Sequence, residues 1–223
     1  MEAGNSSFAN AQVPAWLKRY LRPQDLDLIE ASVREAEIRT QGEIVPVIVR
    51  NSVPMSGAYL SCYLFFVAAM AILDLAFLHE LGWWSFALAL VCGLVLGRVA
   101  VQFRVVLELF VPDADEWKAV HERAELEFYR LGMQKTRDRS GILIFVSMFE
   151  HKVVVLADEG IAKKLPPQIW QDTVAELTAS LRRHDLAPGL TQSVKSCADV
   201  LHVHFPPDSS SHNELKNHLV IKE

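Results

Sequence analysis

The sequence predicts an α/β domain that is interrupted by a hairpin of two membrane-spanning helices. Two long apolar runs, 55–78 and 81–101, follow one another, and each contains a single charge, Asp74 or Arg98. Both flanks show the apolar spacings of helices and strands in soluble proteins. A helix needs about 20 apolar residues to cross a bilayer, so each run is long enough for one span. Two spans return the chain to the side on which it started.

This pattern divides the chain into five predicted parts. The interrupted domain occupies two of them, and the hairpin lies between its halves. The parts are an N-terminal segment 1–22, a first domain part 23–54, a hairpin 55–103 with spans at about 57–78 and 82–102, a second domain part 104–206 and a mobile tail 207–223.

The first domain part predicts a helix followed by a strand. Pro23 begins a pattern with Ile29, Val33 and Ala36 on one face, which is typical of an amphipathic helix. Residues 43–50 are then apolar and rich in β-branched side chains, as in a buried strand. Pro46 within this run indicates an edge position or a bulge, since proline has no N–H to donate to a neighbouring strand.

The second domain part predicts a helix, a β-hairpin and two further helices. The acidic stretch 112–116 complements a helix N-terminus, and Gly132 suits the end of that helix. Strands are expected at 142–147 and 151–157, and the short link between them predicts antiparallel pairing. Pro167 and Pro188 then each begin an amphipathic helix.

Charge and composition limit the location and the partners of the protein. The net charge is −5 and the 22 basic residues are scattered, so no basic stripe indicates nucleic-acid binding. Residues 1–13 lack the basic start and apolar core of a secretory signal. Lys and Arg flank the apolar runs on both sides but are absent from the turn at 79–80. We therefore expect two spans in the cell inner membrane, with both termini cytoplasmic.

Small residues in the second span predict close helix packing. Ala89, Gly93 and Gly97 recur every four residues and form a ridge that another helix can approach. The partner is either the first span, or a second copy or another membrane protein. In the first case the facing small residues are Gly57, Ser61 or Ala68.

The two charges in the spans are expected to lie near opposite membrane surfaces. Asp74 is about four residues from the turn and Arg98 about sixteen, so their depths differ by roughly 18 Å. They are too far apart to form an ion pair within the hairpin. We expect each side chain to extend toward its nearer interface.

The order of these elements and their local sequences resemble the TPM domain, specifically the branch in which two spans interrupt the domain after its first strand. The likeness covers about residues 24–206. It rests on EIRTQGEI at 37–44, FYRLG at 128–132, TRDRSGILI at 136–144, VVVLADEGI at 153–161, Trp170 and HFP at 204–206. The resemblance implies an α/β/α sandwich with a mixed sheet. Phosphatase activity, calcium binding and partner assembly have all been attached to the family, so the resemblance does not imply one function.

Topology predicts an acidic edge on the sheet. If the strand from Gly141 is parallel to the first strand, both begin at the end away from the membrane. Four carboxylates would then gather at that edge: Glu43, Asp138, Asp158 and Glu159. Oxygen ligands of this kind suit a hard cation such as Ca²⁺. In the alternative, Asp138 is a turn residue, Asp158 caps the following loop, and Glu43 pairs with Arg137 or Arg139.

The sequence favours an interaction role over catalysis. It contains no phosphatase cysteine loop, no Gly-x-Ser-x-Gly elbow and no Walker loop. We therefore expect a membrane-anchored, cytoplasm-facing interaction or assembly module. Its partners would be the bilayer and either another protein or a second copy. The alternative is a metal-dependent phosphatase at the acidic edge.

Overall fold

The structure is a computed structural model that describes residues 13–77, 82–110, 113–136, 138–207 and 219–223. The chain forms two compact units. One comprises Met1–Ser52 with Val120–Glu223, and the other comprises Val53–Ala119. The first unit contains the sheet, and the second contains the two long apolar helices.

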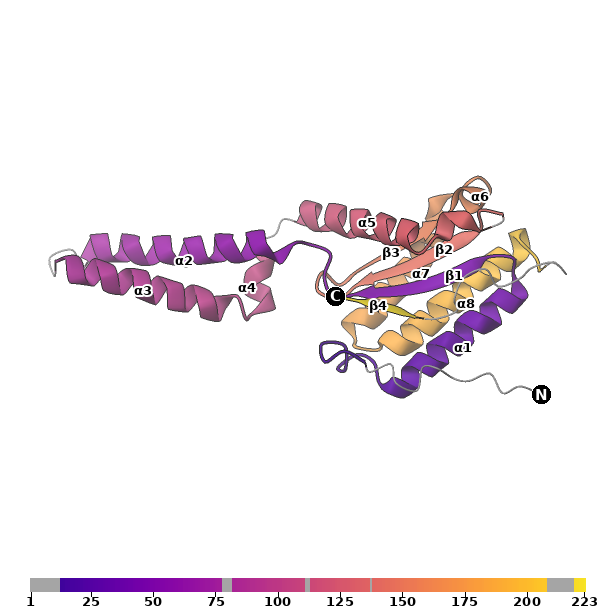
Figure 1. Ribbon diagram of the computed structural model, residues 1–223, viewed down its shortest axis with the longest axis horizontal. Helices are drawn as coiled ribbons and strands as arrows, with labels where there is room; N and C mark the ends of the chain where they lie inside the picture. The colour runs from indigo at the N-terminus through magenta and orange to yellow at the C-terminus, as the bar shows by residue number, and fades with distance from the viewer. Residues whose placement is uncertain (1–12, 78–81, 111–112, 137, 208–218) are drawn as a thin grey trace. The chain divides into compact units, whose positions relative to one another are not determined.

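A mixed four-stranded sheet in the order β3-β2-β1-β4 is the centre of the first unit (Figure 1). Its strands are β1 (Glu43–Val49), β2 (Gly141–Ser147), β3 (Lys152–Ala157) and β4 (Val220–Lys222). β1 is parallel to β2 and β4, whereas β2 and β3 are antiparallel. The predicted parallel pair and the predicted β-hairpin are therefore both confirmed. β1 and β2 are neighbours although the apolar helices separate them in the chain.

Helices cover both faces of this sheet, which confirms the predicted α/β/α sandwich (Figure 1). One core cluster joins the sheet to α1 (Pro23–Arg39), α7 (Gln171–Arg182) and α8 (Leu186–His204). The other joins it to α5 (Asp113–Arg130). Both β1 and β2 are buried along their whole length. Because both faces are covered, these strands are continuous apolar runs rather than alternating ones.

Short helical segments complete the first unit. η2 (Met133–Lys135) follows α5, and α6 (Glu159–Ala162) follows β3. η3 (Pro167–Trp170) lies directly before α7. The helix expected to begin at Pro167 starts with η3 and continues as α7 from Gln171. The helix expected to begin at Pro188 is α8, which begins two residues earlier, at Leu186.

The structure decides between the two alternatives for Pro46 and corrects one further prediction for the sheet. Pro46 causes no bulge, because β1 and β2 keep one continuous register from Glu43 to Val49. β4 pairs only with Val47–Val49, so the proline lies beside the part of β1 that β4 does not cover. The predicted mobile tail 207–223 also contains β4. This strand is too short for a sequence period to reveal it, and residues 208–218 lie outside the described part of the chain.

The second unit contains α2 (Met55–Phe77), α3 (Trp83–Ala100) and the short helix α4 (Arg104–Glu108). We refer to α2 and α3 together as the hairpin. Within the described ranges, two helices are long and apolar enough to cross a membrane, judged by length and composition alone: Ser56–Phe77 and Trp83–Ala100. α4 was not predicted from the sequence. α4 contacts α2. Just after α4, the ring of Phe110 packs against the ring of Phe65 of α2, and the two ring centroids lie 5.7 Å apart.

A fully buried carboxylate, Glu127 of α5, connects this helix to β4. Lys222 Nζ donates a hydrogen bond to Glu127 Oε2, and Arg123 Nε and Arg130 Nη1 each lie 3.2 Å from Oε1. Burial alone would raise the pKa of Glu127. The hydrogen bond and charge of Lys222, together with the two arginines, outweigh burial and lower the pKa below its ordinary value.

We expect this carboxylate to make stability pH-dependent. A lowered folded-state pKa stabilises the fold above the unfolded-state pKa, and the stabilisation is lost as pH falls through the folded-state value. Glu127→Gln should lower the unfolding temperature at neutral pH and flatten its decline in acid. Thermal unfolding across pH measures both effects. Glu125→Gln, at an exposed position that pairs with His121, is the control. Equal pH profiles for the two variants would contradict this role.

Candidate functional site in the hairpin and at the ends of the sheet

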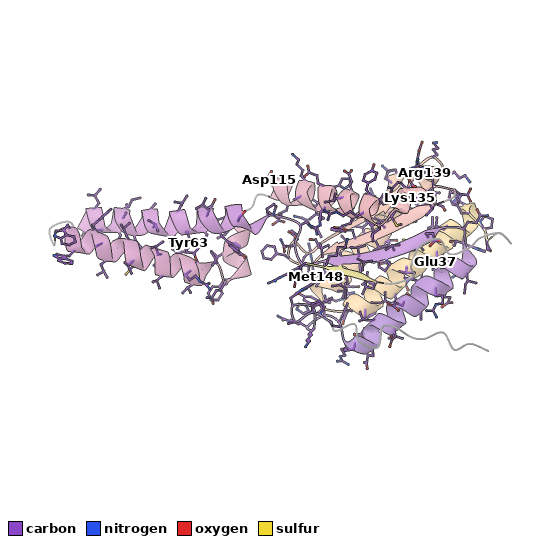
Figure 2. All side chains as sticks on the ribbon, in the orientation of Figure 1. Glu37, Tyr63, Asp115, Lys135, Arg139 and Met148 are labelled. Atoms are coloured by element: carbon purple, nitrogen blue, oxygen red, sulfur yellow. The ribbon has the colours of Figure 1, made fainter. Side chains whose placement is uncertain are left out.

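The two helices of the hairpin pack closely through small residues of α3. The buried positions of α3 are Ser85, Ala89, Gly93, Gly97 and Ala100. A Cβ atom on Gly93 would lie 2.8 Å from Val67 Cα, and one on Gly97 would lie 2.7 Å from Tyr63 Cδ1 (Tyr63 is labelled in Figure 2). Of the two partners that the sequence allowed for this ridge, the structure places the first helix, α2, against it.

The side of α2 that meets this ridge differs from the expected one. Tyr63, Phe66 and Val67 lie opposite the glycines of α3. A Cβ atom on Gly57 would have no atom within 4 Å, and Ser61 and Ala68 are exposed. At Gly93 the contact is therefore between the backbones of the two helices, and at Gly97 the ring of Tyr63 also lies against the glycine, so the contact is not one between two small-residue faces.

The outward faces of the hairpin are apolar and exposed. Only 11% of the most apolar window of α2 and 22% of that of α3 are buried. The exposed large side chains include Leu60, Leu64, Leu75, Leu88, Val91, Leu94 and Val95. A helix that forms part of a soluble core would bury most of these groups.

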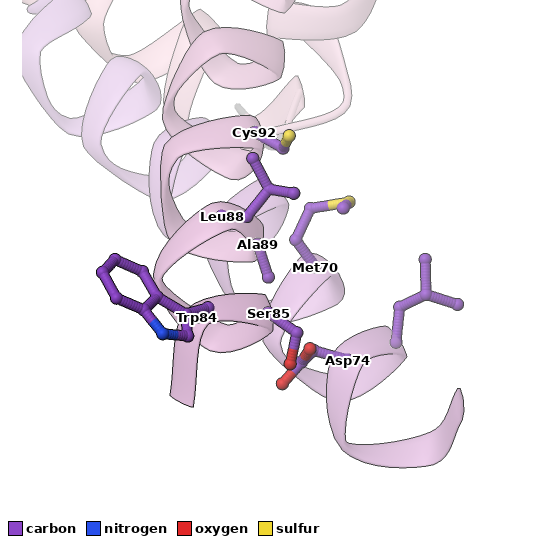
Figure 3. Close-up of a pocket in the computed structure, with 8 residues that line it drawn as sticks. Met70, Asp74, Trp84, Ser85, Leu88, Ala89 and Cys92 are labelled. Atoms are coloured by element: carbon purple, nitrogen blue, oxygen red, sulfur yellow. The ribbon is translucent and has the colours of Figure 1, made fainter. Parts of the chain in front are cut away.

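Asp74 does not extend outward, which corrects the expectation from its depth. Its side chain lies between α2 and α3 and is 5% exposed. Figure 3 shows its carboxylate beside the hydroxyl of Ser85, which is itself buried. Within the described part of the chain, Asp74 Oδ1 has no hydrogen-bond partner. Arg98, in the last turn of α3, is exposed.

Asp74 and Ser85 open onto a groove of about 320 Å³ on the side of the hairpin (Figure 3). We call it the Asp74 groove. The rest of its lining is almost entirely apolar and comes from both helices: Met70, Leu73, Trp84, Leu88, Ala89 and Cys92. One acidic group thus lies in an otherwise apolar surface.

The predicted acidic edge of the sheet is only partly assembled. Glu43 pairs in register with Gly141, and Asp158 N donates a hydrogen bond to Gly141 O at 2.9 Å. Glu43 and Asp158 are therefore buried at the same edge. Asp138 and Glu159 are exposed. The described residues contain no group of three or more His, Cys, Asp or Glu side chains that could hold a metal ion.

Asp158 acts as a cap, as in the alternative interpretation, but it caps the short helix α6 rather than a loop. Its Oδ1 accepts a hydrogen bond from Glu159 N at 2.7 Å at the start of α6, and Arg139 Nη1 lies 3.7 Å away (Arg139 is labelled in Figure 2). Glu159 pairs with Lys163 at 2.8 Å, which lowers the pKa of Glu159. These partners account for the charges of Asp158 and Glu159. The Ca²⁺ site at Glu43, Asp138, Asp158 and Glu159 stays a prediction.

Sequence reasoning missed a polar network at the opposite edge, where β1 and β2 end. Ser147 Oγ donates to Glu150 Oε2 at 2.5 Å, and Ser52 N donates to Glu150 Oε1 at 2.9 Å. The hydroxyls of Ser52 and Ser147 lie 2.7 Å apart. Ligand sites in α/β proteins often lie at such strand ends. Here, however, the polar groups pair with one another, so the network fastens the chain leaving β1 to the β2–β3 turn. Single polar residues carry no sequence signal for such an arrangement.

The close approach at Gly93 gives a direct test of hairpin packing. Gly93→Ala should destabilise the hairpin by about 1–3 kcal/mol, because the added methyl group meets backbone that cannot move aside. Gly57→Ala adds the same group in open space. It should be neutral or stabilising, because alanine favours helix over glycine. Thermal loss of helical circular dichroism in detergent measures both variants. Equal effects would contradict the packing.

The cap at Asp158 gives a second test, which also separates cap from cation ligand. Asp158→Ala should cost about 1 kcal/mol of unfolding free energy, since α6 loses its N-cap. The loss should be the same with and without Ca²⁺ in thermal unfolding. Glu159→Ala, at an exposed position, should have a much smaller effect. A loss that appears only with Ca²⁺ would instead favour the cation site.

Comparisons with known proteins agree with this fold. The TPM domain family matches residues 100–200. The NMR structure of the BA42 protein from the psychrophilic bacterium Bizionia argentinensis is similar, with a TM-score of 0.58 and 17% identity over 91% of this chain and 95% of that chain. At this identity the similarity shows the fold alone. The search of curated proteins gives no match. Residues 100–200 therefore carry the match to the TPM domain family, and the sandwich fold of the chain agrees with that match.

Proposed function

We propose that this protein is a membrane-anchored TPM-domain protein whose domain holds a partner protein near the cytoplasmic face of the inner membrane. The observation that carries the proposal is the exposure of α2 and α3. Both helices are long and apolar enough to span, yet most of their apolar windows are unburied. Such surfaces are unfavourable in water and favourable in lipid.

The insertion point supports an anchor rather than a second domain. The hairpin enters the chain after β1, yet β1 pairs with β2 over all seven residues. The sheet is thus complete although the hairpin interrupts its sequence. Two spans would leave both halves of the sheet on one side of the membrane, which a single span would not allow.

Charges and aromatic residues support the orientation. Arg50 precedes the hairpin and Arg98 ends α3, while the turn contains neither Lys nor Arg. The rings of Trp83 and Trp84 stack with centroids 3.8 Å apart at the start of α3, and both side chains are 68% exposed. Exposed tryptophans at a helix end are typical of a membrane interface. The turn would then face outward, and the domain would face the cytoplasm.

The role in partner binding rests on the chemistry of the domain. The polar network at the ends of β1 and β2 is satisfied internally, and Asp158 serves as a cap. Burial raises the pKa of the Cys197 thiol to about 12, so this cysteine is not a nucleophile at neutral pH. The polar network and the Asp158 cap thus support the fold. No specific observation favours the metal-dependent phosphatase, which stays an alternative predicted from the sequence.

Membrane fractionation tests the anchor. The full chain should stay with membranes during alkaline carbonate extraction, and a variant with residues 55–103 replaced by a Gly/Ser linker should move to the soluble fraction. That variant should also retain a folded domain by circular dichroism, because the sheet does not use the hairpin. A hairpin-containing chain that is extracted by carbonate would contradict the anchor.

Crosslinking of the same two proteins tests partner binding, and a phosphate-release assay tests catalysis. In-cell crosslinking should give a defined adduct with the full chain and lose it when the hairpin is replaced. Release of phosphate in the presence of Mg²⁺ or Ca²⁺, lost in Asp138→Ala or Asp158→Ala, would instead establish the phosphatase.

A further inference from the structure

We propose that the Asp74 groove binds a transmembrane helix of a partner protein that carries a Lys or Arg side chain at the depth of Asp74. The inference deepens the proposed function and rests on it, because the groove is a membrane site only if the hairpin spans. It names where the partner docks and which chemical group it supplies.

The first step of the argument is the state of Asp74. Its side chain is 5% exposed, and Oδ1 has no hydrogen-bond partner in the described part of the chain. The neighbouring Ser85 hydroxyl donates its proton to the Gly82 carbonyl at 2.8 Å. A buried polar group without a partner is costly, and an acidic group inside a membrane more so. A donor from outside the hairpin would remove this cost.

The second step is the surface around the carboxylate. The groove is lined by apolar side chains of both helices, including Leu88, which is 64% exposed, and Trp84, which is 68% exposed (Figure 3). In lipid, apolar exposure alone does not drive association, whereas interhelical hydrogen bonds do contribute. An acid in the lining of an apolar groove therefore suits a helix that is apolar apart from one side chain that donates hydrogen bonds.

The third step concerns the hydrogen-bond donor, which should be a cationic side chain from another protein. Lys offers three N–H donors and Arg five, and either also neutralises the acid. Among residues of α2 and α3, Arg98 is the one basic side chain, and it lies thirteen residues beyond Ser85, roughly 20 Å along the helix. A second copy inserted in the same orientation carries its Arg98 at the same distant depth. Charge complementarity thus favours another protein over self-association.

The test uses the full chain in phosphatidylcholine vesicles and a synthetic Leu/Ala helix as the partner. The peptide has about 24 residues, enough to span, with one Lys a single helical turn from each end, so either orientation presents a Lys at the right depth. A control peptide has Leu at both positions. Energy transfer from a fluorescent donor at the C-terminus of the chain to an acceptor on the peptide reports association.

The wild-type chain should bind the Lys peptide about three- to twentyfold more tightly than the Leu peptide, the range expected for one interhelical hydrogen bond. Asp74→Asn should remove this preference. Ala76→Asn places the same amide at a similar depth on the exposed face, and it should keep the preference. Leu88→Trp should weaken binding by filling the groove while leaving Asp74 in place.

Other outcomes overturn the inference. Equal binding of the two peptides by the wild-type chain, or a Lys preference that persists in Asp74→Asn, would exclude Asp74 as the binding group. Energy transfer between two labelled copies that is lost in Asp74→Asn would assign the groove to self-association. Carbonate extraction of the same vesicles distinguishes a failure of the membrane anchor from a failure of helix docking. A chain that is extracted contradicts both proposals, and a retained chain without Lys preference contradicts only the docking of a cationic helix.

Discussion

The parallel pairing of β1 with β2 is the interaction on which the rest of the structure depends. It runs in one register from Glu43↔Gly141 to Val49↔Ser147 and joins the two halves of an interrupted domain. Each strand contributes apolar side chains to both faces, so the helices on either side have a common surface to cover. A slip by one residue would exchange the two faces of β2. Because helices cover both faces of the sheet, such a slip would be energetically unfavourable. The fixed register in turn determines the two ends of the sheet at which Asp158 and Glu150 lie.

Much of this architecture could be predicted because it depends on strong local patterns. The continuous apolar runs of β1 and β2 predicted both central strands, and the length of the two apolar runs in α2 and α3 predicted the hairpin. β4 could not be predicted, because three residues show no period and their pairing is decided by Val47–Val49. α4 was missed because a single turn carries no periodic signal.

The candidate sites were harder to predict because they depend on which way single side chains turn. Sequence position correctly placed Glu43 and Asp158 at one edge, but it could not reveal that Asp158 caps α6 or that Asp138 is exposed. Depth in the hairpin suggested that Asp74 extends outward. The helical rotation that places it on the face of Ser85 is decided by the packing of Gly93 and Gly97 against α2. Small residues thus determine where the one acidic group of α2 lies.

The position of Pro46 has a consequence for how the protein is made. During synthesis β1 leaves the ribosome before the hairpin, while its partner β2 follows only after the hairpin and α5. Until then β1 is an apolar strand with free edges, and two long apolar helices are synthesised directly after it. Such strands tend to pair with other chains, and proline opposes this pairing by removing a backbone donor. Pro46 fits the finished sheet without a bulge, so it can protect the nascent strand without disturbing its final register.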